Sequence, residues 1–307
     1  MRLVITLFAS ALALGQTPAT IQQITHDGSA NGNLALSADG KLLAFTARFE
    51  KRLVLWLHDT TTGTERRVDL GAGSVRSVAF PPDGKSVYFL KSTRPGFQVL
   101  YEAKLNGSDV KMRLEDVDSS VAFSPDGKSI AFLRNVPAEG KRHLRILSGG
   151  KEREVASWAG PYGGLTEMAW SPDGKQIAAI VRIRARQLLF ISISNGEIKE
   201  VTAPGIVHGL AWPSGAGGLL VLMGGKISVN AFQLWRYALP SRAWTELTND
   251  ESGFRPSQIS SNADGTLVAA TRMTKVKTGV KDLLSWVGLG DAGPRTNPNV
   301  VLIKLPK

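Results

Sequence analysis

Five aspartates are the residues of this chain whose types and spacing most suggest chemistry. Each lies between an apolar segment and a glycine, and together they are Asp39, Asp83, Asp126, Asp173 and Asp264. Carboxylates gathered in a ring could act as general acids and bases or bind a metal ion. However, equivalent residues of successive repeats lie about one repeat apart, so these five cannot converge on one substrate. We interpret them as turn residues, because aspartate bonds the local main chain and glycine accepts a left-handed conformation.

Four histidines are the next candidates for metal binding or proton transfer. We place His26, His143 and His208 near one face of the predicted fold, and His58 near the opposite face. The first three belong to separate repeats, so surface positions are favoured over a shared metal site. The chain has no cysteine, which excludes disulfides and thiolate ligands. We predict no bound metal and no cofactor.

Motifs of several enzyme classes are absent from the sequence. The chain contains no G-x-S-x-G elbow, no H-E-x-x-H zinc motif and no phosphate-binding P-loop. Its 307 residues are 43% hydrophobic and 21% charged, which is typical of a soluble globular domain. We therefore predict a binding protein that is not an enzyme.

The aspartates belong to a longer repeated phrase, in which an apolar strand is followed by Ser-Pro-Asp-Gly-Lys and a second apolar strand. The phrase is clearest at Leu34–Phe45, Val78–Phe89, Val121–Phe132 and Met168–Ala179. The first four aspartates are 44, 43 and 47 residues apart, and the last two are 91 apart, about twice the repeat. A degenerate copy at Leu210–Leu222 falls inside that gap, and a weaker copy covers Ile259–Ala270. Six such units indicate a repeat architecture.

Each unit predicts four antiparallel strands. In the third unit these are the short apolar Ser119–Phe123, the apolar Ser129–Leu133, the alternating His143–Leu147 and the polar Glu152–Ala156. A glycine-containing hairpin joins the last two strands. Four antiparallel strands in some forty residues form one blade of a β-propeller. We predict an all-β fold, a six-bladed β-propeller of four-stranded antiparallel blades.

The two ends of the repeat array predict how the ring closes. The sixth unit has strands at Thr266–Arg272 and Asn299–Leu305 but lacks an outer strand. The segment Ile21–Thr25 is a spare strand before the first complete unit. We expect this N-terminal strand to complete the last blade, which would leave no open edge between the ends.

The repeated Ser-Pro-Asp-Gly-Lys phrase resembles the WD40-like repeat of TolB-type six-bladed propellers. It is also similar to the propeller domains of the dipeptidyl peptidase and prolyl oligopeptidase families. The resemblance covers about residues 20–306. It implies that other envelope proteins dock on a propeller face. TolB carries an additional N-terminal α/β domain, so we expect only the propeller part to carry over.

The first fifteen residues have a different composition from the repeats. Arg2 precedes an apolar run, and Ala13-Leu14-Gly15 resembles a small-x-small cleavage site. We predict a signal peptide at 1–15, a single propeller domain at 16–307, and a periplasmic or secreted bacterial protein. The formal charge of +11 could suit nucleic acid, but the basic residues are scattered and export argues against that partner. We expect a monomer with no transmembrane segment after signal cleavage.

One connection departs from the repeat. Between the second and third strands of the sixth unit, residues 273–298 form an insertion loop with a possible short helix. Such a long loop is a candidate lid over a partner or ligand, or a passive cover on its own blade. Basic residues gather on the same predicted face, and our candidate partner-binding set is Arg48, Lys51, Arg52, Arg134, Arg142, Arg182, Arg184, Arg186, Lys275, Lys277, Lys281 and Trp286.

The central funnel offers a second candidate site. We expect its mouth to be formed by the residues that begin the inner strands, namely Asn33, Ser77, Ser120, Glu167, His208 and Ser257. These side chains are mostly small and polar, which favours binding over catalysis. The leading hypothesis is an exported protein-interaction scaffold that binds an envelope or secreted protein or peptide. The alternative is small-ligand binding, of a carbohydrate or peptide, or lyase or hydrolase activity at the funnel.

Overall fold

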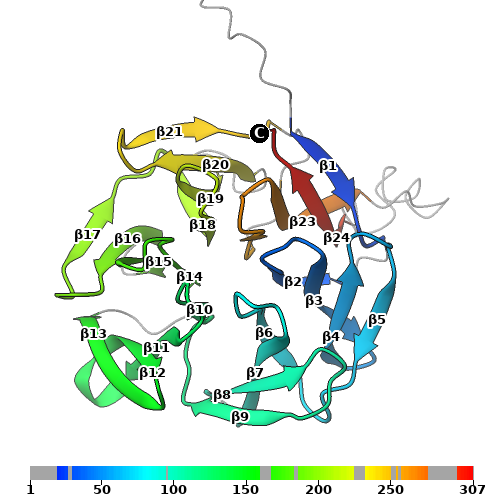
Figure 1. The fold of residues 1–307 in the computed structure, drawn as a ribbon, viewed down its shortest axis with the longest axis horizontal. Helices are drawn as coiled ribbons and strands as arrows, with labels where there is room; N and C mark the ends of the chain where they lie inside the picture. The colour runs from blue at the N-terminus through cyan, green and yellow to red at the C-terminus, as the bar shows by residue number, and fades with distance from the viewer. Residues whose placement is uncertain are drawn as a thin grey trace, which may run out of the picture.

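The computed structural model describes residues 19–26, 30–94, 96–159, 167–182, 186–224, 232–249, 254, 257–275 and 296–306. Within these residues, six four-stranded antiparallel sheets surround a central axis (Figure 1). The only helical element among them is the short 3₁₀ turn Pro137–Glu139. The predicted all-β, six-bladed propeller is therefore confirmed.

Each blade is numbered by its position along the chain, and its strands are given from the axis outward. Blade 1 consists of β2 (Ala30–Leu36), β3 (Leu42–Phe49), β4 (Arg52–Asp59) and β5 (Glu65–Val68). Blade 2 consists of β6 (Val75–Ala79), β7 (Ser86–Arg94), β8 (Phe97–Lys104) and β9 (Lys111–Glu115). Blade 3 consists of β10 (Ala122–Phe123), β11 (Ser129–Val136), β12 (Lys141–Ser148) and β13 (Lys151–Ala159). Blade 4 consists of β14 (Glu167–Trp170), β15 (Gln176–Arg182), β16 (Arg186–Ser192) and β17 (Ile198–Val201). Blade 5 consists of β18 (Ile206–Ala211), β19 (Leu219–Gly224), β20 (Phe232–Ala238) and β21 (Ala243–Glu246). Blade 6 consists of β22 (Ser260–Ser261), β23 (Leu267–Lys275), β24 (Thr296–Lys304) and β1 (Thr20–Gln23).

Blade 6 is closed by the N-terminal strand. β1 pairs antiparallel with β24, with Ile21 opposite Ile303, so the blue and red ends of the chain lie side by side in Figure 1. Beyond the strand, the Thr25 hydroxyl accepts a hydrogen bond from the Val300 N–H at 2.9 Å and donates one to Asn299 Oδ1 at 3.3 Å. The predicted closure of the ring is confirmed.

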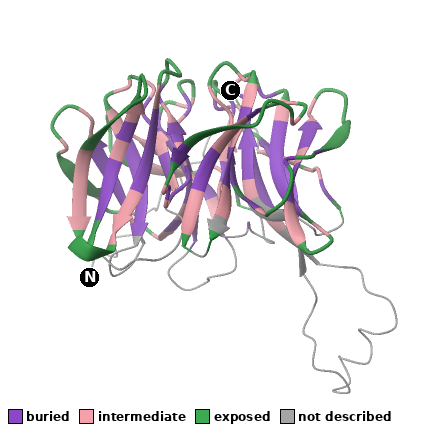
Figure 2. Ribbon diagram, turned by 90° about the horizontal axis from the view of Figure 1, so that it is seen from below, coloured by how far each residue is buried: buried purple, intermediate pink, exposed green. Residues whose placement is uncertain are grey.

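The hydrophobic core lies between the blades, because the second strands are apolar on both faces. All six residues of β19 are buried. Leu144 of blade 3 and Ile177 of blade 4 belong to one buried cluster, and neighbouring blades share further clusters of the same kind. Figure 2 shows these buried segments along the middle of the strands and exposed residues at the turns. Burial of apolar area between blades is the main force that holds the ring together.

The repeated aspartates act as turn residues, as the sequence predicts. In blade 3, Ser124 Oγ donates to Asp126 Oδ1 at 2.6 Å, and the Lys128 N–H donates to the same oxygen at 3.1 Å. Gly127 completes the turn with φ of 70°. Blade 4 repeats the arrangement, with Ser171 Oγ 2.6 Å from Asp173 Oδ1. In both blades the serine hydroxyl and then the main-chain N–H hold the pKa of the aspartate below 3.8.

This hydrogen bonding predicts an acid-dependent contribution to stability. A folded-state pKa below the unfolded value means that ionised Asp173 stabilises the fold above the unfolded pKa, and that this stabilisation is lost as the pH falls through the folded pKa. We expect Asp173→Asn to lower the thermal unfolding midpoint at pH 7, and the difference from the parent protein to shrink towards about pH 2.5. Thermal unfolding followed by circular dichroism at both pH values measures it. A difference that is independent of pH would contradict the assignment.

Candidate functional site

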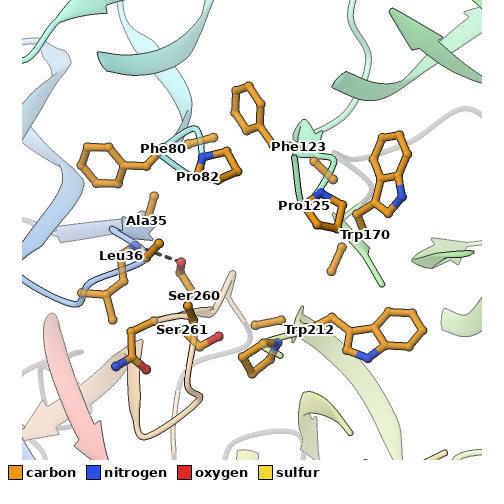
Figure 3. A pocket seen from close by; sticks show the side chains of 18 of the residues that line it. Ala35, Leu36, Phe80, Pro82, Phe123, Pro125, Trp170, Trp212, Ser260 and Ser261 are labelled. Atoms are coloured by element: carbon orange, nitrogen blue, oxygen red, sulfur yellow. Dashed lines mark hydrogen bonds between the residues drawn. The ribbon is translucent and has the colours of Figure 1, made fainter. Parts of the chain in front are cut away.

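A cavity of about 350 Å³ lies on the propeller axis. It opens on what we call the turn face, the side that carries the turns between first and second strands at residues 37–41, 81–85, 124–128, 171–175, 213–218 and 262–266. The inner strands and these turns line it, and four of the turns contribute prolines, namely Pro81, Pro82, Pro125, Pro172 and Pro213. Figure 3 shows Pro82 and Pro125 on the wall of this space. The turn that positions each blade therefore also builds the cavity rim.

Main-chain groups of the inner strands point towards the axis. The Ser124 N–H donates to the Ser129 carbonyl at 2.9 Å, and the Ser171 N–H donates to the Gln176 carbonyl at 2.8 Å. In an antiparallel pair, the residue next to such a hydrogen-bonded position directs its N–H and C=O away from the partner strand. Phe123 and Trp170 occupy these neighbouring positions, so their main-chain groups face the cavity. The cavity thus offers both hydrogen-bond donors and acceptors.

The aromatic side chains near the cavity are used for packing between blades. Phe123 meets Tyr88 edge-to-face with ring centroids 4.9 Å apart, and Trp212 stacks on Phe190 at 5.2 Å. Figure 3 shows the Trp170 and Trp212 rings extending away from the centre of the pocket. Trp170 belongs to the buried cluster between blades 3 and 4, and Trp212 packs against the cluster between blades 4 and 5, so both are packing residues. The Phe123 and Trp212 rings are thus engaged in contacts between blades.

Blade 6 differs from the other five where it meets the cavity. Each other inner strand ends in alanine followed by leucine or an aromatic residue, at 35–36, 79–80, 122–123, 169–170 and 211–212. Blade 6 has Ser260 and Ser261 instead. Ser260 Oγ accepts a hydrogen bond from the Leu36 N–H at 2.9 Å (Figure 3), which joins blade 6 to blade 1. The Ala263 N–H also donates to the Ala38 carbonyl at 2.8 Å across the same seam.

The residues that line the cavity carry no ionisable side chain. Their polar side chains are those of serine, asparagine and glutamine, most of them from blade 6. Within the described parts of the chain, no group of three or more histidine, aspartate or glutamate side chains is placed to hold a metal ion. The chemistry that this lining supports is hydrogen bonding and apolar contact with an uncharged group.

The six predicted funnel-mouth residues are not among those that line the cavity. Ser77 and Ser120 are buried. Asn33 Nδ2 donates to Thr46 Oγ1 at 3.3 Å, and Glu167 Oε2 accepts from the Leu210 N–H at 3.3 Å.

The other two mouth residues also contact neighbouring residues of the fold. The His208 ring lies edge-on to Phe232 with centroids 4.4 Å apart, and Ser257 Oγ donates to the carbonyl of Gln258 at 3.3 Å. Glu167 begins β14, whereas Asn33, Ser77 and His208 lie within β2, β6 and β18, and Ser120 and Ser257 precede β10 and β22. Their role at a funnel mouth stays a prediction.

The predicted basic surface is brought together only in part. Arg48, near the end of β3, and Lys51, in the turn before β4, are exposed. Arg52 donates to the Gly71 carbonyl at 3.1 Å. Arg134 forms an ion pair with Glu152 at 2.8 Å, so much of its charge is balanced within blade 3.

The prediction that Arg142 belongs to the partner-binding surface is wrong. It lies inside β12, which begins at Lys141, and its exposed fraction is only 2%. It therefore cannot belong to an exposed partner-binding surface. Arg182, Arg186 and Lys275 lie at strand ends in β15, β16 and β23.

The insertion of blade 6 is shorter than predicted. Met273 pairs with Pro298 and Lys275 pairs with Thr296, because β23 and β24 continue into the segment assigned to the loop. The connection between these strands is 276–295, which lies outside the described residues, as do Arg184, Lys277, Lys281 and Trp286.

Solved structures of TolB proteins and of a lyase are similar in fold to this chain. TolB from Acinetobacter baumannii gives a TM-score of 0.64 at 16% sequence identity, and the match covers 87% of this chain and 64% of that protein. A putative TolB from Agrobacterium tumefaciens gives 0.62 at 14% identity, covering 95% of this chain and 100% of that one. An oligogalacturonate lyase in complex with manganese gives 0.58 at 14% identity, covering 95% and 98%.

No protein-family model and no curated protein sequence matches the chain. In the structural match, this chain spans less than two thirds of the length of the Acinetobacter TolB. No helix in the described part of the chain is long and apolar enough to cross a membrane. The similarity at these identities concerns the fold, and that fold is a TolB-like six-bladed β-propeller.

Proposed function

We propose that this protein is an exported, non-enzymatic interaction scaffold that holds a segment of a protein partner in the axial cavity. The observation that carries the proposal is an open cavity at the centre of the turn face whose lining has no ionisable side chain. Its volume of about 350 Å³ is at the small end of the range for ligand sites, which suits a short chain segment inserted from a larger partner.

The chemistry of the lining supports binding more than catalysis. A lyase or hydrolase needs groups that accept and donate protons close to the reacting atoms. The lining instead consists of apolar residues, several of them prolines or aromatic, together with main-chain groups and neutral polar side chains. Two similar structures are TolB proteins, which supports a scaffold role. Export rests on residues 1–15, which lie outside the described part of the chain.

A second partner surface is supported by blade 1. Arg48 and Lys51 are exposed on the face opposite the turn face, where they could attract an acidic partner. We keep this basic surface as a proposed secondary contact, whose remaining residues are Arg182, Arg184, Arg186, Lys275, Lys277, Lys281 and Trp286.

Photo-cross-linking tests the proposed site. A photoreactive benzoylphenylalanine in place of Pro125, at the cavity rim, is expected to capture a protein from an envelope extract. The matched control carries the same residue in place of Pro240, an exposed proline in the hairpin between β20 and β21 on the turn face. Capture at position 125 but not at 240 supports the proposal. Equal capture at both positions, or none at 125, contradicts it.

The alternative function is supported by the similarity to the oligogalacturonate lyase, which covers nearly the whole of both chains. On that hypothesis the cavity would bind a carbohydrate and not a protein. Incubation with oligogalacturonate and Mn²⁺ tests it by chromatography of the products. Shortened chains that disappear in a Pro125→Arg variant would favour the lyase, whereas intact chains would favour the scaffold.

A further inference from the structure

The polar side chains of the cavity wall that remain available to a ligand come from one blade. Ser124 Oγ is used by its own turn, where it contacts Asp126, and Ser214 Oγ donates to the Ala263 carbonyl at 2.9 Å. Asn262 Oδ1 accepts from the Leu267 N–H at 2.9 Å. By contrast, the half-buried Gln258 amide and Ser261 hydroxyl bond to no other described residue.

Blade 6 therefore forms a polar wall, which we define as Gln258, Ser260 and Ser261. Ser260 uses its oxygen to accept from Leu36, but its own hydroxyl proton is not used in that bond. Half-buried polar groups of this kind are favourable only when water or a ligand supplies hydrogen bonds. The wall thus presents donors and acceptors towards the cavity.

The opposite side of the cavity is apolar. Blades 2 and 3 contribute Pro82 and Pro125, together with Phe80 and Phe123, whose rings extend away from the centre of the pocket (Figure 3). Neither side contains a charge that could pair with a charged ligand. Burial of an unpaired charge is strongly unfavourable, so an occupant must be neutral where it enters the cavity.

A peptide fits this lining better than a sugar. Sugar sites commonly stack a ring on an aromatic face, but the Phe123 and Trp212 rings here already pack against Tyr88 and Phe190. The main-chain groups of Phe123 and Trp170 face the cavity and could pair with the main chain of an extended segment. Prolines in turn suit contact with leucine- or proline-sized side chains.

We propose that the cavity selects an uncharged, extended peptide segment in which a leucine or proline lies beside a glutamine, asparagine or serine. The apolar residue would lie against Pro82 and Pro125, and the polar residue would bond to the wall of Gln258 and Ser261. This inference rests on the proposed function, because it specifies the segment that the scaffold holds.

A phage-displayed library of random heptapeptides, selected on the full-length protein, tests the specificity. Selected sequences are expected to be neutral at their core and to pair leucine or proline with an amide or hydroxyl residue. The double variant Gln258→Leu/Ser261→Ala should bind the selected peptides about tenfold more weakly, as expected for the loss of one or two hydrogen bonds. The matched control, Gln22→Leu/Ser194→Ala, makes the same changes on the outer surface and should not alter affinity.

The outcomes separate the inference from the proposed function. Binding of charged-core peptides, or equal binding by the two double variants, would overturn the specificity while leaving a peptide-binding scaffold. No enrichment on the parent protein, together with no cross-link at position 125, would overturn both. Thermal unfolding of each variant shows whether the fold is retained, and a Ser261→Thr variant that keeps the hydroxyl should retain binding.

Discussion

Replacement of Gly196 by alanine is expected to lower the free energy of unfolding by about 3 kcal/mol. Gly196 lies in the hairpin between β16 and β17 with φ of 69°, a conformation that alanine adopts with difficulty. In addition, a Cβ at this position would overlap the carbonyl oxygen of Val155 in β13 of the neighbouring blade. Because the backbone of residue 196 fixes the position of the Cβ and the oxygen belongs to the main chain of Val155, relief of the overlap requires blades 3 and 4 to separate. Urea unfolding followed by tryptophan fluorescence measures the change.

Blade 1 provides a matched control for this substitution. Gly63 has φ of 73° in a hairpin with the same hydrogen bonds, but an added Cβ would meet no atom within 4 Å. Gly63→Ala should therefore report only the backbone strain, about 1 kcal/mol. The difference between the two variants measures the contact between blades. If the two variants lose the same free energy of unfolding, the close approach of the blade 4 hairpin to β13 does not cause the effect of Gly196→Ala.

Substitution of Thr25 by valine is expected to destabilise the protein by about 2 kcal/mol. Valine keeps the shape of threonine but cannot accept the hydrogen bond from the Val300 N–H, which is buried beside β1. The bond from Thr25 to Asn299 Oδ1 is lost as well, and Asn299 is only 1% exposed. A buried donor left without an acceptor explains the size of the expected effect.

The control for Thr25 is serine, which retains the hydroxyl. Thr25→Ser should recover most of the stability that Thr25→Val loses, apart from the packing of one methyl group. Differential scanning calorimetry of the three proteins provides the comparison. If serine and valine destabilise equally, the methyl group and not the hydrogen bond would be the important part of Thr25.

The sequence predicts the fold well because the information that specifies it is local. Ser-Pro-Asp-Gly-Lys encodes a turn through contacts within five residues, as the bonds of Ser124 and Lys128 to Asp126 show. Its recurrence then sets the number of blades. Even the degenerate fifth copy at Leu210–Leu222 was recognisable by its spacing, and it forms β18 and β19. Ring closure followed from the missing outer strand of the sixth unit.

The site was harder to predict because it is formed by residues from all six repeats. Once the turns are interpreted as local structure, nothing in one turn shows that Pro82, Pro125 and Pro172 meet around a cavity. The burial of Arg142 could not be predicted, because the orientation of its side chain depends on where β12 begins. A signal for the cavity was nevertheless present, since Ser260-Ser261 replaces the alanine and large apolar residue of the other five inner strands.

The pairing of β1 with β24 also has a consequence for folding kinetics. The bond between Thr25 and Val300 joins residues 275 apart, whereas the described strands of blades 1 to 5 are each contiguous in sequence. Those five blades can form in order during synthesis, but β1 has no partner until β24 has been made. Contacts of such long separation close a long loop, so we expect this one to form late in folding. Thr25→Val should therefore accelerate unfolding and leave the folding rate nearly unchanged, the behaviour of a contact absent from the transition state.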